Sequence, residues 1–142
     1  MLGLLVISHG RLAEELVNAV RTIVGSVEAL EAVSIGWNDE VEESARRIEE
    51  AIRNVDCGQG VLLLTDMFGG TPTNLALSLH EEGKIEIVTG VNLPMLIKFA
   101  NLREQLDLHA AAGRIAEQGR GAIHVASHFL QAPEPGQDVE ES

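Results

Sequence analysis

The stretch Leu2-Gly3-Leu4-Leu5-Val6-Ile7-Ser8-His9-Gly10 opens the chain with an apolar run that ends in a histidine. A continuous apolar run of this length predicts a strand that is buried on both faces of a sheet. Histidine at the carboxyl end of such a strand is poorly placed for core packing. In parallel α/β sheets this end borders the crevice in which ligands bind. His9 is therefore a candidate base, metal ligand or nucleophile.

Three further strand patterns alternate with helical patterns along the chain. The strands are predicted at 2–8, 31–35, 61–65 and 85–89, and the intervening helices at 12–24, 39–55 and 73–80. Asn38 and Thr71 are the expected N-caps of the second and third helices, and Pro72 suits a first helical position. This order predicts an α/β fold with a mainly parallel sheet and helices on both faces.

The pattern changes after residue 90. Residues 93–100 and 102–117 predict two helices, and Ala122–Ala126 predicts a short final strand at the edge of the sheet. Residues 1–130 are thus expected to form a single domain. The remaining residues, 131–142, predict an acidic, proline-containing flexible tail.

Charge and composition exclude several classes of function. The chain of 142 residues has 10 basic and 22 acidic side chains, a formal net charge of −12, and one cysteine. Such an acidic chain is not expected to bind nucleic acid or an anionic membrane surface directly. A lone cysteine and the absence of metal-ligand spacing argue against a zinc site, so no cofactor is expected. The composition suits a cytoplasmic protein.

A second group of candidate site residues follows the third predicted strand. Asp66 ends that strand and Gly69-Gly70-Thr71 precedes the next helix. If the first and third strands are neighbours, as in a flavodoxin-like order, Asp66 and His9 lie side by side. The paired glycines and the helix N-terminus then form a site suited to a phosphate-sized anion, with the Thr71 hydroxyl beside it.

This pairing suggests a mechanism of phosphoryl acceptance. A carboxylate that accepts one ring N–H fixes the tautomer of His9 and leaves the other nitrogen able to attack phosphorus. The lysine of a P-loop motif is missing near Gly69-Gly70, and the Gly-x-Ser-x-Gly pattern of a nucleophile elbow is absent from the sequence. Neither a P-loop protein nor a serine hydrolase is therefore favoured. A small-anion-binding α/β protein remains an alternative on these residues alone.

Three blocks of sequence together resemble the mannose-type enzyme IIA proteins of the bacterial sugar phosphotransferase system. They are Ser8-His9-Gly10, then Asp66 with Gly69-Gly70-Thr71-Pro72-Thr73-Asn74, then Gly90-Val91-Asn92-Leu93-Pro94-Met95-Leu96. The resemblance covers roughly residues 1–130. It implies a phosphotransferase in which His9 takes phosphate from the histidine-containing phosphocarrier protein and passes it to a IIB component. Asp66 then corresponds to the family's aspartate, and Gly69, Gly70 and Thr71 to its phosphoryl-binding turn.

The resemblance also implies partners and assembly. Membrane contact is expected only indirectly, through permease components. A homodimer is expected, and Ala122–Ala126 corresponds to the edge strand that members of the family often exchange between subunits. The same fold could instead serve as a regulatory phospho-acceptor without transport. Trp37, Met67 and Phe68 lie just past strand ends, where loops are normally polar. Because aromatic and methionine side chains are enriched at interface centres, these three are candidates for partner docking.

Overall fold

The computed structural model describes residues 1–130, so the predicted tail at 131–142 lies outside the described residues. The strands are β1 (Gly3–His9), β2 (Leu30–Ile35), β3 (Val61–Thr65) and β4 (Ile85–Thr89). The helices are α1 (Leu12–Val24), α2 (Val41–Val55), α3 (Gly70–Ser78), α4 (Leu93–Leu102) and α5 (Leu108–Gly121), followed by a 3₁₀ turn, η1 (Ala126–Leu130). None of the helices within 1–130 combines the length and apolar character that crossing a bilayer requires.

The four strands form one parallel sheet in the order β2-β1-β3-β4. This confirms the predicted flavodoxin-like neighbourhood of the first and third strands. Ile7 pairs with Thr65 across β1 and β3, and His9 pairs with Ile35 across β1 and β2. The register therefore brings the loops that follow β1, β2 and β3 together at one edge of the sheet.

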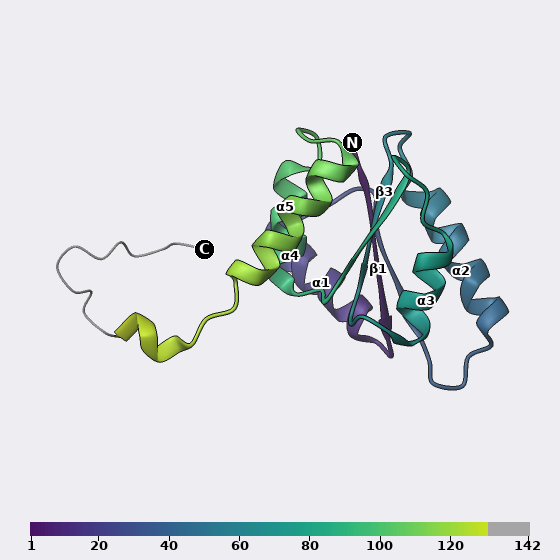
Figure 1. Ribbon diagram of the computed structural model, residues 1–142, viewed down its shortest axis with the longest axis horizontal. Coiled ribbons are helices and arrows are strands. Elements are labelled where there is room, and N and C mark those ends of the chain that lie inside the picture. The colour runs from purple at the N-terminus through teal and green to yellow at the C-terminus, as the bar shows by residue number, and fades with distance from the viewer. Residues whose placement is uncertain (131–142) are drawn as a thin grey trace.

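Helices cover both faces of the sheet, as the alternating pattern predicted. One face carries α1, α4 and α5, and the other carries α2 and α3 (Figure 1). Strand β1 supplies both cores: Leu4 and Val6 pack on the first face, and Leu5 and Ile7 on the second. All four are buried, as expected for a central strand whose side chains alternate between two covered faces.

Two predicted helix starts are wrong. Helix α2 begins at Val41 after Glu40, because the Asn38 region is part of a separate turn. Helix α3 begins at Gly70 after Gly69, so Thr71 is inside the helix and does not cap it. Pro72 is consequently the third helical residue instead of the first. The left-handed backbone of Gly69 and Gly70, with φ of 92° and 81°, lets the chain enter the helix earlier than the cap pattern suggested.

The predicted edge strand at Ala122–Ala126 is also wrong for the single chain. Helix α5 continues to Gly121, and the chain then leaves the body of the molecule (Figure 1). Its backbone groups bond locally, with the amide of His128 donating to the carbonyl of Val125 at 3.0 Å. A strand needs a neighbour to pair its backbone, and within residues 1–130 this segment has none.

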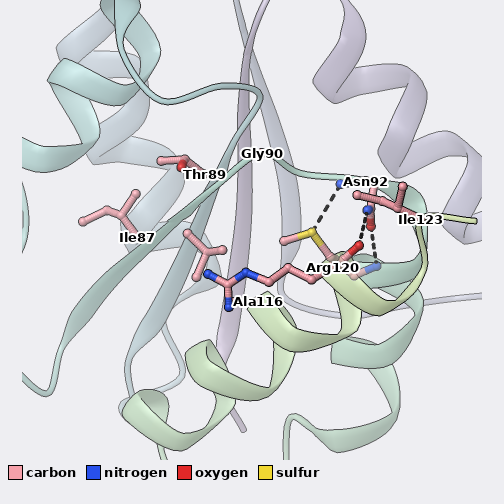
Figure 2. Close-up of a pocket in the computed structure, with 10 residues that line it drawn as sticks. Ile87, Thr89, Gly90, Asn92, Ala116, Arg120 and Ile123 are labelled. Atoms are coloured by element: carbon pink, nitrogen blue, oxygen red, sulfur yellow. Dashed lines mark hydrogen bonds between the residues drawn. The ribbon is translucent and has the colours of Figure 1, made fainter. Parts of the chain in front are cut away.

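The turn after β4 is fixed by Asn92. Its side chain accepts a hydrogen bond from the amide of Met95, which caps α4, and donates to the carbonyl of Gly119 in α5 (Figure 2). An open cleft of about 360 Å³ lies beside this turn, between β4 and α5. Ile123, just beyond α5, lines the same cleft. Asn92 thus holds α4 and α5 together at the outer edge of the sheet.

Candidate functional site

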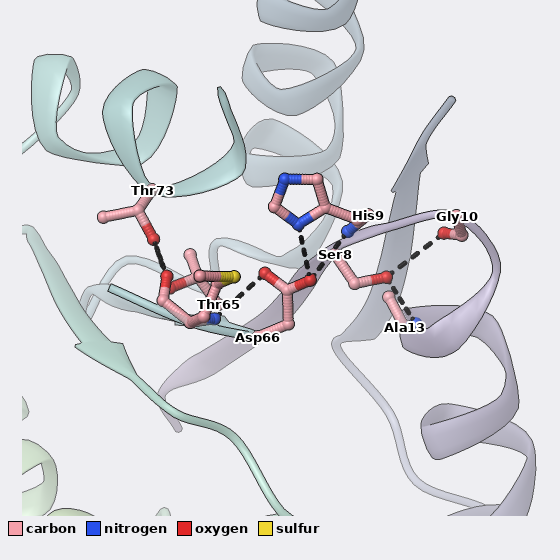
Figure 3. A network of polar contacts seen from close by, with 8 residues as sticks. Ser8, His9, Gly10, Ala13, Thr65, Asp66 and Thr73 are labelled. Atoms are coloured by element: carbon pink, nitrogen blue, oxygen red, sulfur yellow. Dashed lines mark hydrogen bonds and ion pairs between the residues drawn. The ribbon is translucent and has the colours of Figure 1, made fainter. Parts of the chain in front are cut away.

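His9 and Asp66 meet where β1 and β3 end (Figure 3). The Nδ1 atom of His9 lies 2.7 Å from Oδ2 of Asp66, and the His9 backbone amide donates to the same oxygen at 2.9 Å. The other carboxylate oxygen accepts from the amide of Met67 at 3.0 Å. The side chains of His9 and Asp66 are only 22% and 12% exposed. The predicted pair therefore exists, with the carboxylate fixed by three hydrogen bonds.

This contact determines which imidazole nitrogen is available for chemistry. An ionised carboxylate only accepts hydrogen bonds, so Nδ1 of His9 carries the proton when it faces Asp66. The lone pair then lies on Nε2, and residues 1–130 offer that atom no hydrogen-bond partner. The site therefore presents one nucleophilic nitrogen, and Asp66 is placed to balance positive charge that develops on the ring.

The glycine turn lies directly against this nitrogen. A Cβ atom at Gly70 would be 3.0 Å from both Cε1 and Nε2 of His9, so only glycine leaves the imidazole its present position. The turn leads into α3, whose first amides have no partner within the helix. Together with the helix dipole, these amides favour an anion. Of the predicted glycines, Gly70 is thus brought to the imidazole, and Gly69 precedes it in the same turn.

Thr71 and Thr73 lie in the same turn of α3 but have different surroundings. Thr71 is exposed at the start of α3, with its hydroxyl in no hydrogen bond within the described residues. Thr73 is fully buried, and its hydroxyl contacts the hydroxyl of Thr65 at 2.8 Å and the carbonyl of Met67 at 2.5 Å. Thr73 therefore ties the turn to the end of β3. Sequence reasoning missed this residue, although a threonine on the buried face of a short helix was a usable signal.

Ser8 is a second positioning residue that sequence reasoning did not identify. Its buried hydroxyl accepts from the amide of Ala13 at 2.7 Å and donates to the carbonyl of Gly10 at 3.2 Å (Figure 3). These bonds fold the chain sharply between β1 and α1. Ser8 therefore fixes the turn that follows His9, whereas Asp66 fixes the imidazole ring and the backbone amide of His9.

The three predicted docking residues lie around the same edge. Trp37, Phe68 and Met67 are 84%, 77% and 55% exposed. Trp37 contacts the imidazole directly: its ring stacks on His9 with the centroids 5.2 Å apart and the planes at 27°. Met67 and Phe68 belong to the turn between β3 and α3. An apolar rim therefore borders the imidazole.

The sequence matches a known protein family and several known proteins. Residues 3–116 match the protein family described as PTS system fructose IIA component. The fructose-specific EIIA component of the PTS system of Bacillus subtilis (strain 168) is 28% identical over 132 residues, or 92% of this chain and 90% of that protein. The mannose-specific EIIAB component of Escherichia coli (strain K12) is 30% identical over 138 residues, or 90% of this chain and 41% of that protein.

The fold is also found among solved structures. The phosphotransferase system component EIIA from Streptococcus agalactiae superposes with a TM-score of 0.82. The match covers 90% of this chain and 99% of that one, with 20% sequence identity. At that identity the similarity shows the fold alone, and the family match carries the functional information.

Proposed function

This chain belongs to the family of PTS system fructose IIA components, phosphocarriers in a relay for sugar uptake, and we propose that His9 is the residue that carries its phosphoryl group. Membership confirms the phosphocarrier function predicted from the sequence. The observation that carries the proposal for His9 is the 2.7 Å contact between its Nδ1 atom and Asp66. That contact leaves Nε2 to face the Gly70 turn.

Asp66 acts in this proposal by orienting and balancing the imidazole. Attack of Nε2 on phosphorus forms a nitrogen–phosphorus bond as the donor's own phosphorus–nitrogen bond breaks and its electron pair stays on the donor. Nδ1 remains protonated, so the His9 ring becomes cationic. The carboxylate of Asp66 stabilises this charge at a distance that already exists in the unphosphorylated protein. When the phosphoryl group moves on, the ring returns to its neutral form without a change of partner.

The phosphoryl oxygens are received by the turn that precedes α3. The first amides of α3 and the left-handed glycines Gly69 and Gly70 support a concave anion site next to Nε2. The Thr71 hydroxyl, exposed at the first turn of α3, can donate to one of these oxygens after rotation about its side-chain bond. This assigns substrate binding to Gly69, Gly70 and Thr71.

The partners are those of the family: the histidine-containing phosphocarrier protein as donor and a IIB component as acceptor. We place their docking surface on Trp37, Met67 and Phe68, which are exposed beside His9. The formal charge of −12 favours a basic donor. The cytoplasmic location of this exchange remains a prediction.

A homodimer is also part of the proposal. The segment after α5 exposes four apolar side chains, Ile123, Val125, Phe129 and Leu130. Strand β4 is at the edge of the sheet, and the open cleft between β4 and α5 is lined both by this strand and by Ile123. Exposed apolar side chains and an unpaired sheet edge are both features that association with a second copy would cover. We assign the dimer contact to this C-terminal segment.

The experiment that tests the proposed acceptor is phosphorylation from phosphoenolpyruvate through enzyme I and the phosphocarrier protein. One acid-labile, base-stable phosphate per chain is expected on the wild-type protein and none on His9→Ala. His109→Ala is the matched control, because that histidine lies on α5 and should leave labelling unchanged. Retention of the label by His9→Ala would reject the assignment.

A further inference from the structure

Trp37 occupies a position that core packing does not explain. It is the only tryptophan of the chain, and it remains 84% exposed near the start of the loop that follows β2. Large aromatic side chains are usually buried when they serve the core. The ring contact that this indole makes within residues 1–130 is with the imidazole of His9, at a centroid distance of 5.2 Å.

The loop that bears Trp37 is a closed turn. The Asp39 carboxylate accepts from the amide of Gly36 at 2.7 Å, and the Asp39 amide donates to the Gly36 carbonyl at 3.2 Å. Arg47 of α2 lies 3.6 Å from the same carboxylate. Because His9 and Ile35 are paired across β1 and β2, this turn starts beside the imidazole. The indole is therefore held over His9 before any partner arrives.

Two different groups thus restrain the imidazole. Asp66 bonds to the ring edge at Nδ1, which fixes rotation of the ring about the Cβ–Cγ bond. Trp37 covers a face of the ring, with the two planes 27° apart, which opposes displacement toward solvent. Gly70 approaches the edge that holds Nε2 and Cε1. The combination keeps Nε2 directed at the anion-binding turn.

We propose that Trp37 is a positioning residue for phosphoryl transfer, which holds the His9 ring and stabilises its phosphorylated, cationic form. This inference rests on the proposed role of His9. In the transfer, the Nε2 lone pair forms a bond to phosphorus while the donor's phosphorus–nitrogen bond breaks, and its electron pair stays on the donor. The proton on Nδ1 stays in its bond to Asp66. The negative face of the indole attracts the resulting cationic ring, and the attraction ends when the phosphoryl group leaves.

A small phosphodonor separates this role from docking. Phosphoramidate transfers its phosphoryl group to histidine with loss of ammonia, and it has no protein surface that could bind the apolar rim. The rate of His9 phosphorylation by phosphoramidate is expected to fall on the order of two- to tenfold in Trp37→Leu, in line with the strength of aromatic stacking and cation–π contacts. Trp37→Phe should restore most of the rate. Ile23→Ala, which alters an exposed apolar residue of α1, should have the wild-type rate.

Tryptophan fluorescence supplies a second readout, because the chain contains one tryptophan and no tyrosine. A cationic imidazole in contact with an indole quenches its emission. Emission is therefore expected to fall as wild-type His9 takes up phosphate and to recover when the phosphate is removed. Asp39→Ala opens the turn that holds Trp37 and should reduce this change, while folding is preserved because Asp39 is exposed.

Equal phosphoramidate rates for wild type and Trp37→Leu would overturn the inference. So would unchanged emission in a wild-type protein that holds one phosphate per chain. In both cases the proposed function of His9 would stand. Failure of the wild-type protein to take phosphate from either the protein donor or phosphoramidate would instead overturn both.

Discussion

Asp66 uses both carboxylate oxygens, and two of its three hydrogen bonds end on His9. In Asp66→Asn the amide oxygen can still accept from Nδ1, but the side chain no longer balances a positive ring. We therefore expect the fold to persist and the rate of phosphoryl transfer to fall by about tenfold to 10⁴-fold, the range seen for orienting carboxylates. Rapid-quench measurement of transfer from the phosphocarrier protein gives this rate.

Asp56→Asn is the matched control, since Asp56 follows α2 and its carboxylate bonds only to the amide of Gly58 among the described residues. It should transfer phosphate at the wild-type rate. An Asp66→Asn protein that matches this control would mean that the carboxylate of Asp66 has a purely structural role.

The residues of this site differ in how far sequence could identify them. His9 and Asp66 could be predicted because each lies at the carboxyl end of an apolar strand, and parallel strands end at one edge. The stacking of Trp37 on His9 depends on the shape of a turn closed by Asp39, which no periodicity encodes. Thr73 was missed because its hydroxyl acts through tertiary contacts with β3 and its turn.

Arg103, just past α4, joins this helix to the amino ends of β1 and β2, which lie at the other end of the strands from His9. Its guanidinium is buried and donates to three backbone carbonyls, those of Leu2, Glu28 and Ala29. Burial lowers the pKa of this guanidinium, because loss of water disfavours the charged form, and nearby carboxylates oppose the shift. The side chain therefore acts as a structural connection between α4, the start of β1 and the turn before β2.

Removal of this connection should destabilise the fold without affecting the chemistry. Arg103→Ala removes the guanidinium donors to all three carbonyls, although the Ala29 carbonyl keeps its bond from the amide of Leu4. Because the buried Leu2 carbonyl loses both of its guanidinium bonds, we expect the free energy of unfolding to fall by about 2–3 kcal/mol. Arg103→Lys, which keeps the charge but has fewer donors, should lose less. Urea denaturation checks both. An Arg103→Ala protein with the wild-type midpoint would show that water satisfies these carbonyls equally well.

At the level of elements, the sequence identified all four strands and the order of helices, because each buries a continuous or periodic apolar face. The segment Ala122–Ala126 was wrongly predicted because β-favouring residues such as Ile123 and Val125 indicate only a local preference. A strand also requires a neighbour with unpaired backbone groups, and the single chain supplies none to this segment within residues 1–130.

For the whole molecule, docking of the phosphocarrier protein should depend on both charge and the apolar rim. Long-range attraction by a chain of charge −12 is screened beyond about 8 Å at 0.15 M salt, so association should slow as salt rises. Phe68→Ala should mainly speed dissociation, because loss of an interface anchor typically costs ~2 kcal/mol or more. Stopped-flow binding at several salt concentrations separates the two effects. If Phe68→Ala dissociates at the rate of a Leu77→Ala control, the docking surface lies elsewhere.

Assembly is a second property of the whole molecule. Sedimentation equilibrium at micromolar concentration is expected to give twice the 15.3 kDa of one chain. Truncation after Gly121 removes the exposed apolar segment and should give a monomer, whereas truncation after Leu130 retains it and should give a dimer. A wild-type monomer, or a dimer that survives truncation after Gly121, would contradict the assigned contact.

In the proposed site, Asp66 occupies Nδ1 of His9 and thereby directs phosphate to Nε2. The most direct measurement is nuclear magnetic resonance of the phosphorylated protein with ¹⁵N-labelled histidine, in which coupling to ³¹P identifies the bonded nitrogen. The structure predicts phosphorus coupling at Nε2 of His9, with the proton retained on Nδ1. Coupling at Nδ1 would show that Asp66 does not direct phosphate to Nε2, and coupling at the ring of any other histidine would show that His9 is not the acceptor.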